Sequence, residues 1–231
     1  MAYEERATAV GGAVLWRQAV DDALGARRIL PDGCLDLIWD GQRLLVAGPD
    51  TAARWHHTPP GTVFVGLRLS CGLGPALLGI PADQLVDEYP DLDQVWAPAP
   101  VRALTEQAAA DPESALEQWA VKSAAHRPAD PLGGRVQTMA AAGVSVADMA
   151  DRTGYSSRQL HRRCLALFGY GPRHLARILR LGRALDEARA GRPLADVAAW
   201  CGYVDQAHMT HDVRALTGAT PTTLLEAAVT G

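Results

Sequence analysis

The chain has 231 residues, of which 48% are hydrophobic, and this is enough to bury two modest cores. No uninterrupted apolar run approaches the ~20 residues that span a bilayer, and no basic leader precedes a short apolar segment, so we expect a cytoplasmic protein. The four cysteines lie far apart and form no C-x-x-C pair, which argues against a structural zinc site and a secreted disulfide scaffold. The composition therefore predicts two domains with no metal or other cofactor.

The formal net charge of −4 is shared unevenly between the two parts of the chain. Residues 1–130 contain 10 Lys and Arg against 18 Asp and Glu, whereas residues 131–231 contain 12 arginines against 8 acidic residues. The planar guanidinium of arginine can contact a phosphate or a guanine edge through two N–H groups. We therefore expect the C-terminal part to bind nucleic acid and the acidic N-terminal part not to.

The N-terminal part contains short β-prone runs separated by turn residues. Runs at 35–39, 44–47 and 62–69 are divided by Asp40-Gly41 and by Pro59-Pro60-Gly61, which favours antiparallel strands. Segments 82–88 and 101–125 are predicted to be helical. We expect these elements to form a small β-barrel-like domain with helices, and because such barrels can hold one small ligand, a sensor role follows.

Three side chains of this part are candidate ligand contacts, namely Trp39, Trp55 and Arg68. The two tryptophans either line a pocket or fill the barrel, and the sequence does not separate these alternatives. A lone cation in an apolar strand is costly to bury without a partner, which favours a functional role for Arg68 or a pairing with Asp36.

The cysteines and histidines of this part have simpler interpretations. Cys34 and Cys71 are expected to pack in the core and not to form a redox pair, because free cysteine is among the most buried residue types. His56 and His57 could bind a metal ion, but neighbours on an extended strand point to opposite faces and cannot both face one ion. We therefore expect them to be loop or surface histidines.

Residues 126–134 contain two prolines and two glycines and form the predicted linker, which divides the chain into domains 1–128 and 129–231. Beyond the linker the sequence repeats itself. Asp148-Met149-Ala150 and Gly154-Tyr155 recur at an offset of 48, as Asp196-Val197-Ala198 and Gly202-Tyr203, and Gly169 and Pro172 recur at an offset of 49. One unit of structure is therefore used twice.

Each copy has the pattern of a helix, a tight turn and a second helix. In the first copy, Ser145 is expected to cap a helix at 146–153, Gly154 to end it, and Ser156 or Ser157 to cap the next helix. At 100° per residue, this second helix has an apolar face and an opposite polar face. The apolar face comprises Leu160, Cys164 and Leu167, and the polar face comprises Arg158, His161 and Arg162.

The second copy begins at Pro193 and turns at Gly202-Tyr203. Its second helix places Met209, Val213 and Leu216 inward and Ala207, Thr210, His211 and Arg214 outward. Between the copies, residues 173–190 form a helix ended by Gly191. Its apolar face comprises Leu175, Ile178, Leu179, Gly182 and Leu185, and its other face comprises Arg173, Arg177 and Arg180. A rigid spacer therefore joins the two units.

The second helix of a helix-turn-helix presents its outer face to the major groove, and a helical spacer would set two such helices about one DNA turn (~34 Å) apart. Residues 135–225 resemble the DNA-binding domain of the AraC family of transcriptional regulators, through GYSSRQLHRRCLALFGYGP at 154–172 and CGYVDQAHMTHDVRALTGATP at 201–221. The resemblance implies base contacts at Arg158, His161, Arg162, Gln206, Ala207, Thr210 and His211. The candidate contacts to the DNA backbone are Ser157, Arg173, Arg177, Arg180 and Arg214.

The second copy departs from the family pattern at three positions. His211 stands where the family usually has arginine, and Met209 and Val213 stand where it usually has phenylalanine. We therefore expect the first unit to be the main reader of the DNA sequence.

Residues 1–125 resemble a cupin-like N-terminal domain of unknown function that is often attached to such regulators, through RILPDGCLDLIWDGQRLLVAGPDT at 28–51 and GLRLSCGLGPALLGIP at 66–81. The expected fold class is α+β, with an all-α C-terminal domain of two helix-turn-helix units and a linker helix. The resemblance implies a DNA-binding transcriptional regulator and not an enzyme. Its partners would be double-stranded DNA and, as further candidates, a small-molecule effector, RNA polymerase and a second copy of the chain.

Two alternative functions remain at this point. A DNA-repair sensor that accepts methyl groups on a zinc-held cysteine needs about four clustered cysteines, whereas the N-terminal part has two, 37 residues apart. G-x-S-x-G, H-E-x-x-H and Gly-rich phosphate-loop motifs are absent as well. The other alternative is a regulator whose N-terminal domain only dimerises or contacts another protein.

The charge distribution yields a first prediction. A fragment of residues 131–231 should bind DNA and a fragment of residues 1–130 should not, because the positive charge and both outer faces lie in the former. Electrophoretic mobility shifts of the two fragments on the same duplex test this. Comparable DNA affinity of the N-terminal fragment would contradict it.

Overall fold

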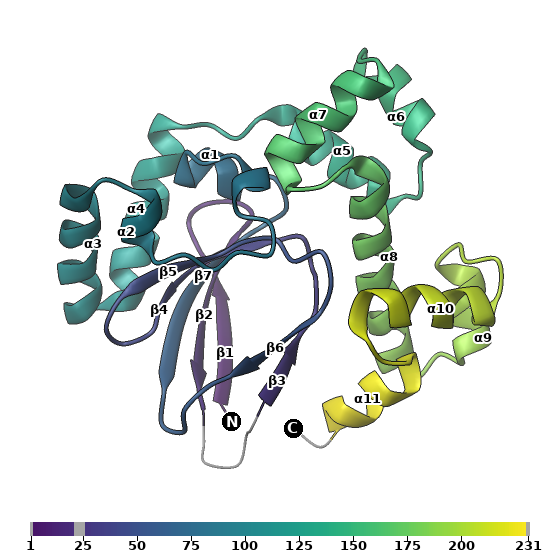
Figure 1. The fold of residues 1–231 in the computed structure, drawn as a ribbon, viewed down its shortest axis with the longest axis horizontal. Helices are drawn as coiled ribbons and strands as arrows, with labels where there is room; N and C mark the ends of the chain where they lie inside the picture. Colours follow the sequence, from purple (N-terminus) through teal and green to yellow (C-terminus); the bar gives the residue numbers. More distant parts are fainter. Residues whose placement is uncertain (1, 21–25, 230–231) are drawn as a thin grey trace.

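The computed structural model describes residues 2–20 and 26–229 of the chain. It has an N-terminal half built on β-sheets and a C-terminal half that is entirely helical, so the expected α+β class is confirmed (Figure 1). None of the described helices is long and apolar enough to cross a membrane.

The described strands form two antiparallel sheets. The larger sheet has the strand order β1-β2-β7-β4-β5, and β3 and β6 pair separately, so the strands do not form the single continuous sheet of a closed barrel. Expected strands at 35–39 and 44–47 are confirmed with the same bounds. The strands are β1 (Ala2–Ala7), β2 (Ala13–Ala19), β3 (Ala26–Ile29), β4 (Leu35–Trp39), β5 (Leu44–Ala47), β6 (Arg54–His57) and β7 (Val63–Leu69).

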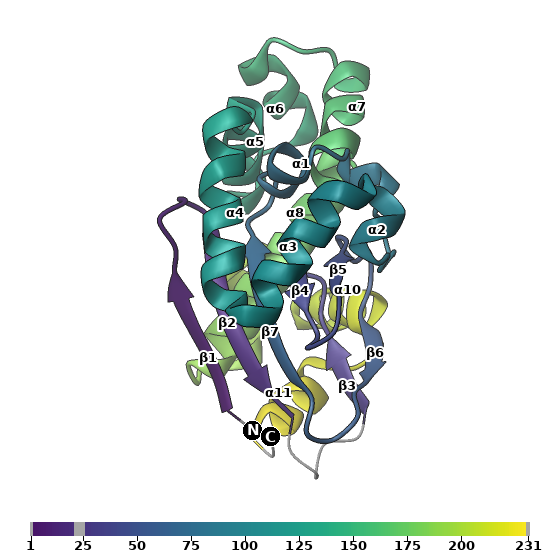
Figure 2. The same cartoon turned by 90° about the vertical axis from the view of Figure 1, so that its left-hand side faces the viewer.

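One face of the larger sheet is covered by helices, with α3 and α4 in front of it in Figure 2. Alternate residues of β4, namely Leu35, Leu37 and Trp39, point into the core between the sheet and these helices. The single helix expected at 101–125 is two helices, because Asp111 caps the second by accepting from the Ser114 amide. The helix expected at 82–88 is one 3-10 turn. The elements are α1 (Gly74–Leu78), η1 (Ala82–Gln84), α2 (Leu92–Val95), α3 (Pro98–Ala110) and α4 (Pro112–His126).

The C-terminal half follows the predicted repeat closely. The linker is shorter than expected, because Gly133 and Gly134 lie within α5 and only 127–130 connect the halves. Ser145 caps α6 by accepting from the Asp148 amide, as predicted. The helices are α5 (Pro131–Ala141), α6 (Val146–Thr153), α7 (Ser157–Phe168), α8 (Pro172–Arg189), α9 (Leu194–Trp200), α10 (Gln206–Thr217) and α11 (Pro221–Val229).

The two halves are packed against each other. Cys71 of the N-terminal half is buried in the same apolar cluster as Phe168 of α7. A Cβ atom added at Gly72 would lie 3.0 Å from the Phe168 ring, so only glycine allows this approach. Further along, the amide of Ala53 donates to the carbonyl oxygen of Leu216 over 2.7 Å. Both helix-turn-helix units therefore touch the N-terminal half.

Two glycines with opposite surroundings test the packing of the fold. A Cβ atom at Gly66 would lie 2.2 Å from the ring of Trp16, whereas Gly182 in α8 has open space around it. We expect Gly66→Ala to lower the free energy of unfolding by about 1–3 kcal/mol through overpacking. Gly182→Ala should raise it by about 0.5–1 kcal/mol, because alanine favours the helix interior. Urea unfolding midpoints of both variants measure this. Equal midpoints would contradict the close contact between Gly66 and the Trp16 ring.

Candidate DNA interface

Helix α7 is held by its cap and by its apolar seam. The hydroxyl of Ser156 accepts from the Gln159 amide, and the Gln159 side chain accepts from the Ser156 amide, which forms a capping box. Leu160 and Cys164 are fully buried, as predicted for the inner face. The opposite face is exposed and has a shallow concavity lined by Ser156, Arg158, Gln159 and Arg162.

The ring of His161 lies beside the N-terminus of α8. A Cβ atom at Gly171 would be 2.9 Å from the His161 ring, so the histidine lies against this glycine while remaining exposed. The base-reading candidates of the first unit thus share one exposed face of α7, formed by Arg158, His161 and Arg162.

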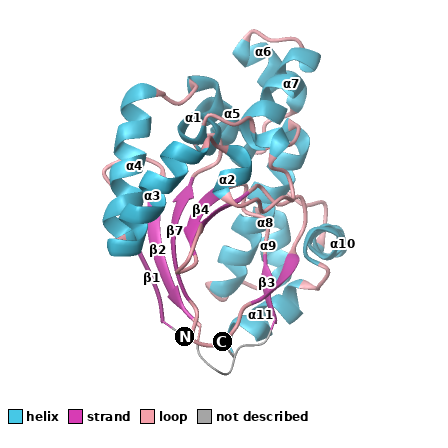
Figure 3. Cartoon of the chain, turned by 60° about the vertical axis from the view of Figure 1, so that its left-hand side comes forward, coloured by secondary structure: helices cyan, strands magenta, loops and turns pink. Residues whose placement is uncertain are grey.

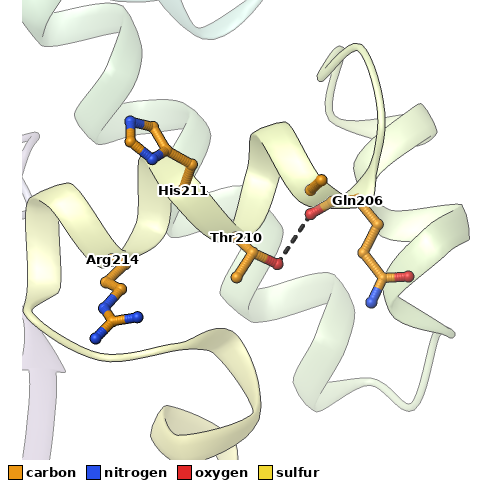
Figure 4. Close-up of a pocket in the computed structure, with 5 residues that line it drawn as sticks. Gln206, Thr210, His211 and Arg214 are labelled. Atoms are coloured by element: carbon orange, nitrogen blue, oxygen red, sulfur yellow. Dashed lines mark hydrogen bonds between the residues drawn. The ribbon is translucent and has the colours of Figure 1, made fainter.

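Helix α10 has the same construction. Asp205 caps it by accepting from the His208 amide over 2.7 Å, and Met209 and Val213 pack inward. The outer face has a second shallow concavity, and Figure 4 shows the side chains that line it. Its lining residues are Gln206, Ala207, Thr210, His211 and Arg214. The hydroxyl of Thr210 donates to the Gln206 carbonyl oxygen over 2.9 Å, so it is turned toward its own helix.

The two units differ by one residue in the turn. Both α7 and α10 have 12 residues and end at a left-handed glycine, Gly169 or Gly218. Their caps, Ser156 and Asp205, are 49 positions apart, whereas the turn glycines are 48 apart. The inserted residue is Val204, which is 86% exposed in the turn.

Helix α8 runs from the end of α7 to the second unit, so it connects the two helix-turn-helix units (Figure 1). Of the backbone candidates, Ser157, Arg173 and Arg214 are exposed. Arg177 and Arg180 instead form ion pairs with Asp212 of α10. The two arginines share this one carboxylate, and their side chains are 33% and 24% exposed, so their contact with DNA phosphates stays a prediction. The buried face of α8 is also shifted from the prediction: it includes Leu181, whereas Gly182 is exposed.

The three ligand candidates of the N-terminal half do not come together. Trp39 is 7% exposed and packs in the core on the helix-covered face of the sheet. Arg68 lies on the opposite face, because it pairs with Asp36 across the β4–β7 register. Trp55 is 58% exposed, with the guanidinium of Arg28 stacked 4.6 Å from its ring centroid.

Arg68 belongs to a polar cluster that the sequence did not predict in full. Its Nε atom lies 3.6 Å from Asp36 and 3.7 Å from Asp32. The indole N–H of Trp16 donates to Asp36 over 2.6 Å. Burial raises the pKa of Asp36 to about 6, although the charge of Arg68 opposes the shift. Trp16 was missed because its strand, β2, was not predicted.

The cysteines and histidines of the N-terminal half have mixed outcomes. All four cysteines are free; Cys71 is buried as predicted, whereas Cys34 is half-buried, and burial raises the pKa of the Cys71 thiol to about 12. The prediction of loop histidines is wrong, because His56 and His57 lie in strand β6, where His56 is half-buried and His57 is exposed. The described residues contain no group of three or more side chains that could hold a metal ion.

Two protein families match parts of the chain. A family described as "Helix-turn-helix domain" matches residues 149–227, which contain both recognition helices, α7 and α10. A family described as "Domain of unknown function (DUF6597)" matches residues 13–91, which contain most of the sheet. No curated protein matches the chain.

Solved structures resemble all or part of the chain. ToxT from Vibrio cholerae aligns over 97% of this chain and 98% of its own, with a TM-score of 0.50 and 9% sequence identity. A ToxT structure bound to (E)-4-(8-methylnaphthalen-1-yl)but-3-enoic acid has the same TM-score and coverage at 8% identity. A probable AraC family transcriptional regulator from Rhodopseudomonas palustris CGA009 aligns over 43% of this chain and 98% of its own, with a TM-score of 0.38 and 24% identity. The chain therefore carries an AraC-type helix-turn-helix domain behind a domain of the second family, and it is a DNA-binding transcriptional regulator.

Proposed function

We propose that the chain is a sequence-specific regulator that reads two successive segments of the DNA major groove, one with each recognition helix. The observation that supports this is the pair of exposed polar faces on α7 and α10, both carried by the single linker helix α8. In this proposal residues 129–231 bind DNA and residues 1–128 regulate that binding.

The individual roles follow from side-chain chemistry. Arg158 and Arg162 have guanidinium groups that can contact guanine through two N–H groups, and His161 can contact an acceptor between them. The second unit offers weaker groups, because Ala207 carries no polar atom and the hydroxyl of Thr210 is bonded to its own helix. Ser157, Arg173 and Arg214 are proposed to contact phosphates, which position the protein without reading bases.

The first unit generates a test of sequence reading. Arg158→Ala and Arg162→Ala should each remove about 1–3 kcal/mol of discrimination at one position of the site and leave non-specific affinity nearly unchanged. Sites selected from random DNA with the full-length protein, followed by affinities for selected and scrambled duplexes at one salt concentration, measure this.

Arg102→Ala is the matched control, because it removes an exposed arginine from α3 in the N-terminal half. It should preserve the ratio of specific to non-specific binding. The proposal fails if the two α7 variants retain the wild-type ratio, or if the wild-type protein selects no site.

The second part of the proposal is a small-molecule effector bound on the face of the sheet that carries Arg68. Trp16, Asp36 and Arg68 supply an aromatic ring and two charges in the middle of this face. The His56 ring of β6 lies edge-on to Phe64 of β7, with centroids 6.3 Å apart, so the two sheets touch at this point. In Figure 3, β3 of the smaller sheet lies on the side of the larger sheet away from α3 and α4. Sites of this kind combine apolar walls with a few placed polar groups. The organic acid bound to ToxT is a precedent in a protein of similar fold.

Native mass spectrometry of the purified full-length protein tests the effector. We expect a retained small molecule whose occupancy falls in Arg68→Ala, because that variant leaves Asp36 without its cation. Arg43→Ala is the control, since Arg43 is an exposed arginine that pairs with Asp91. A stable dimer without any retained molecule would favour the alternative in which the N-terminal domain only dimerises.

A further inference from the structure

Helix α10 carries an acidic side chain on the face that it buries. Asp212 is 6% exposed and lies at the edge of the apolar stripe formed by Met209, Val213 and Leu216, which pack in the core of the second unit. An ionised carboxylate is costly to bury unless partners satisfy its charge and its lone pairs. The partners of Asp212 therefore decide what it does.

Two arginines of the linker helix supply these partners. Nε of Arg177 donates to Oδ1 of Asp212 over 2.8 Å, and its Nη2 lies 2.7 Å from the same oxygen. Nη2 of Arg180 donates to Oδ2 over 3.2 Å. The guanidinium of Arg180 also lies over the ring of Tyr203, 4.3 Å from its centroid, and Tyr203 belongs to the turn before α10. Both carboxylate oxygens are thus held from α8, and one of the arginines holds the turn as well.

These hydrogen bonds restrict the rotation of α10 about its own axis, which the apolar contacts restrict less. Hydrophobic burial is non-directional, so Met209 and Val213 keep α10 on α8 but still allow small rotations of the helix. Charge-assisted hydrogen bonds have preferred distances and angles. Thr210 and His211 immediately precede Asp212 in the same helix turn, so a rotation of α10 about this point moves both side chains across the base edges.

The first unit has an equivalent contact with the charges reversed. Arg163 is the seventh residue after its cap Ser156, and Asp212 is the seventh residue after its cap Asp205. Arg163 forms an ion pair with Asp130, which caps α5. Each recognition helix therefore has, at the same position, an ion pair to a helix outside its own helix-turn-helix pair. The pair of the second unit is the buried one, because the Asp212 side chain is 9% exposed and that of Arg163 is 46% exposed.

We propose that Asp212 is a positioning residue for DNA reading: held by Arg177 and Arg180, it sets the rotation of α10 and so decides which of its outer side chains meet the bases. This rests on the proposed function of α10 as the second reader. It also gives Arg177 and Arg180 a role in holding α10 instead of a contact with DNA phosphates. Gln206 and His211 would read base edges through directional hydrogen bonds, so the contribution of the second unit depends on how closely α10 is placed.

Asp212→Asn in the full-length protein tests the proposal, because asparagine keeps the shape and removes the charge. Discrimination at base pairs in the half of the site read by α10 should fall about fivefold or more, which is the lower end of the value of one good base contact. Discrimination in the half read by α7 should stay unchanged. Affinities for duplexes substituted in one half at a time measure the two effects separately.

Arg177→Gln is a second, independent test of the proposal. It is needed if circular dichroism shows that the Asp212→Asn variant is not folded. It should reproduce the loss in the α10 half while the slope of log K against log salt stays at the wild-type value. The double variant should lose no more than either single variant, since both act through one pair. Arg189→Gln is the matched control, because Arg189 is an exposed arginine of α8 paired with Asp186, and it should leave both halves unchanged.

Three results would overturn the inference. They are wild-type discrimination in both halves for Asp212→Asn, an equal loss in both halves, and a salt slope lowered by about one unit in Arg177→Gln, which would mark Arg177 as a phosphate contact. A wild-type protein without any sequence preference would instead refute the proposed function, so the two failures are distinguishable.

Discussion

The sharing of helix α8 between two apolar cores is the constraint on which the C-terminal half depends. Leu175 and Ile178, near its start, are buried with α5, α6 and α7, whereas Leu181 and Leu185, one turn further, are buried with α9, α10 and α11. Because one continuous helix belongs to both cores, neither recognition helix can move far without disturbing packing that also holds the linker. The distance between the two reading faces is therefore set by the length of α8 and not by a flexible connection.

The N-terminal half makes contacts at both ends of this arrangement. At the first unit, Tyr170 is 5% exposed and its hydroxyl has no hydrogen-bond partner in the described part of the chain, although it lies against Gly33 and Cys71. Toward the second unit, a ring nitrogen of His174 lies 3.1 Å from the Thr51 carbonyl oxygen, next to the hydrogen bond that joins Ala53 to α10. A shift of the segment around Thr51 would thus reach the linker helix and the second reader together. Under the proposed function, an effector on the sheet would have a short physical route to DNA binding, because the segment lies between strands β5 and β6.

Prediction from the sequence succeeded where structure depends on neighbours along the chain. The cap Ser145, the choice of Ser156 or Ser157 as the next cap, the turn glycine Gly154 and the apolar seams of α7 and α10 are local features, and each was predicted from spacing alone. It failed for β1 and β2, whose mixture of charged, aromatic and small residues gives no clear alternation. The helix break at Asp111 was also missed, although a capping aspartate followed by proline was present as a signal.

The sequence by itself determined that the chain has two helix-turn-helix units on a helical spacer, because a repeated pattern of caps, glycines and apolar positions is written in consecutive residues. Only the tertiary structure decided which polar residues are exposed and which pair with other parts of the protein. Arg177 and Arg173 look alike in the sequence, yet one pairs with Asp212 and the other is exposed, because the packing of α10 on α8 brings Asp212 to one of them. Likewise, the pairing of β4 with β7 placed Arg68 beside Asp36 and left Trp39 on the opposite face. Such choices depend on contacts between residues far apart in the chain, and no local pattern encodes them.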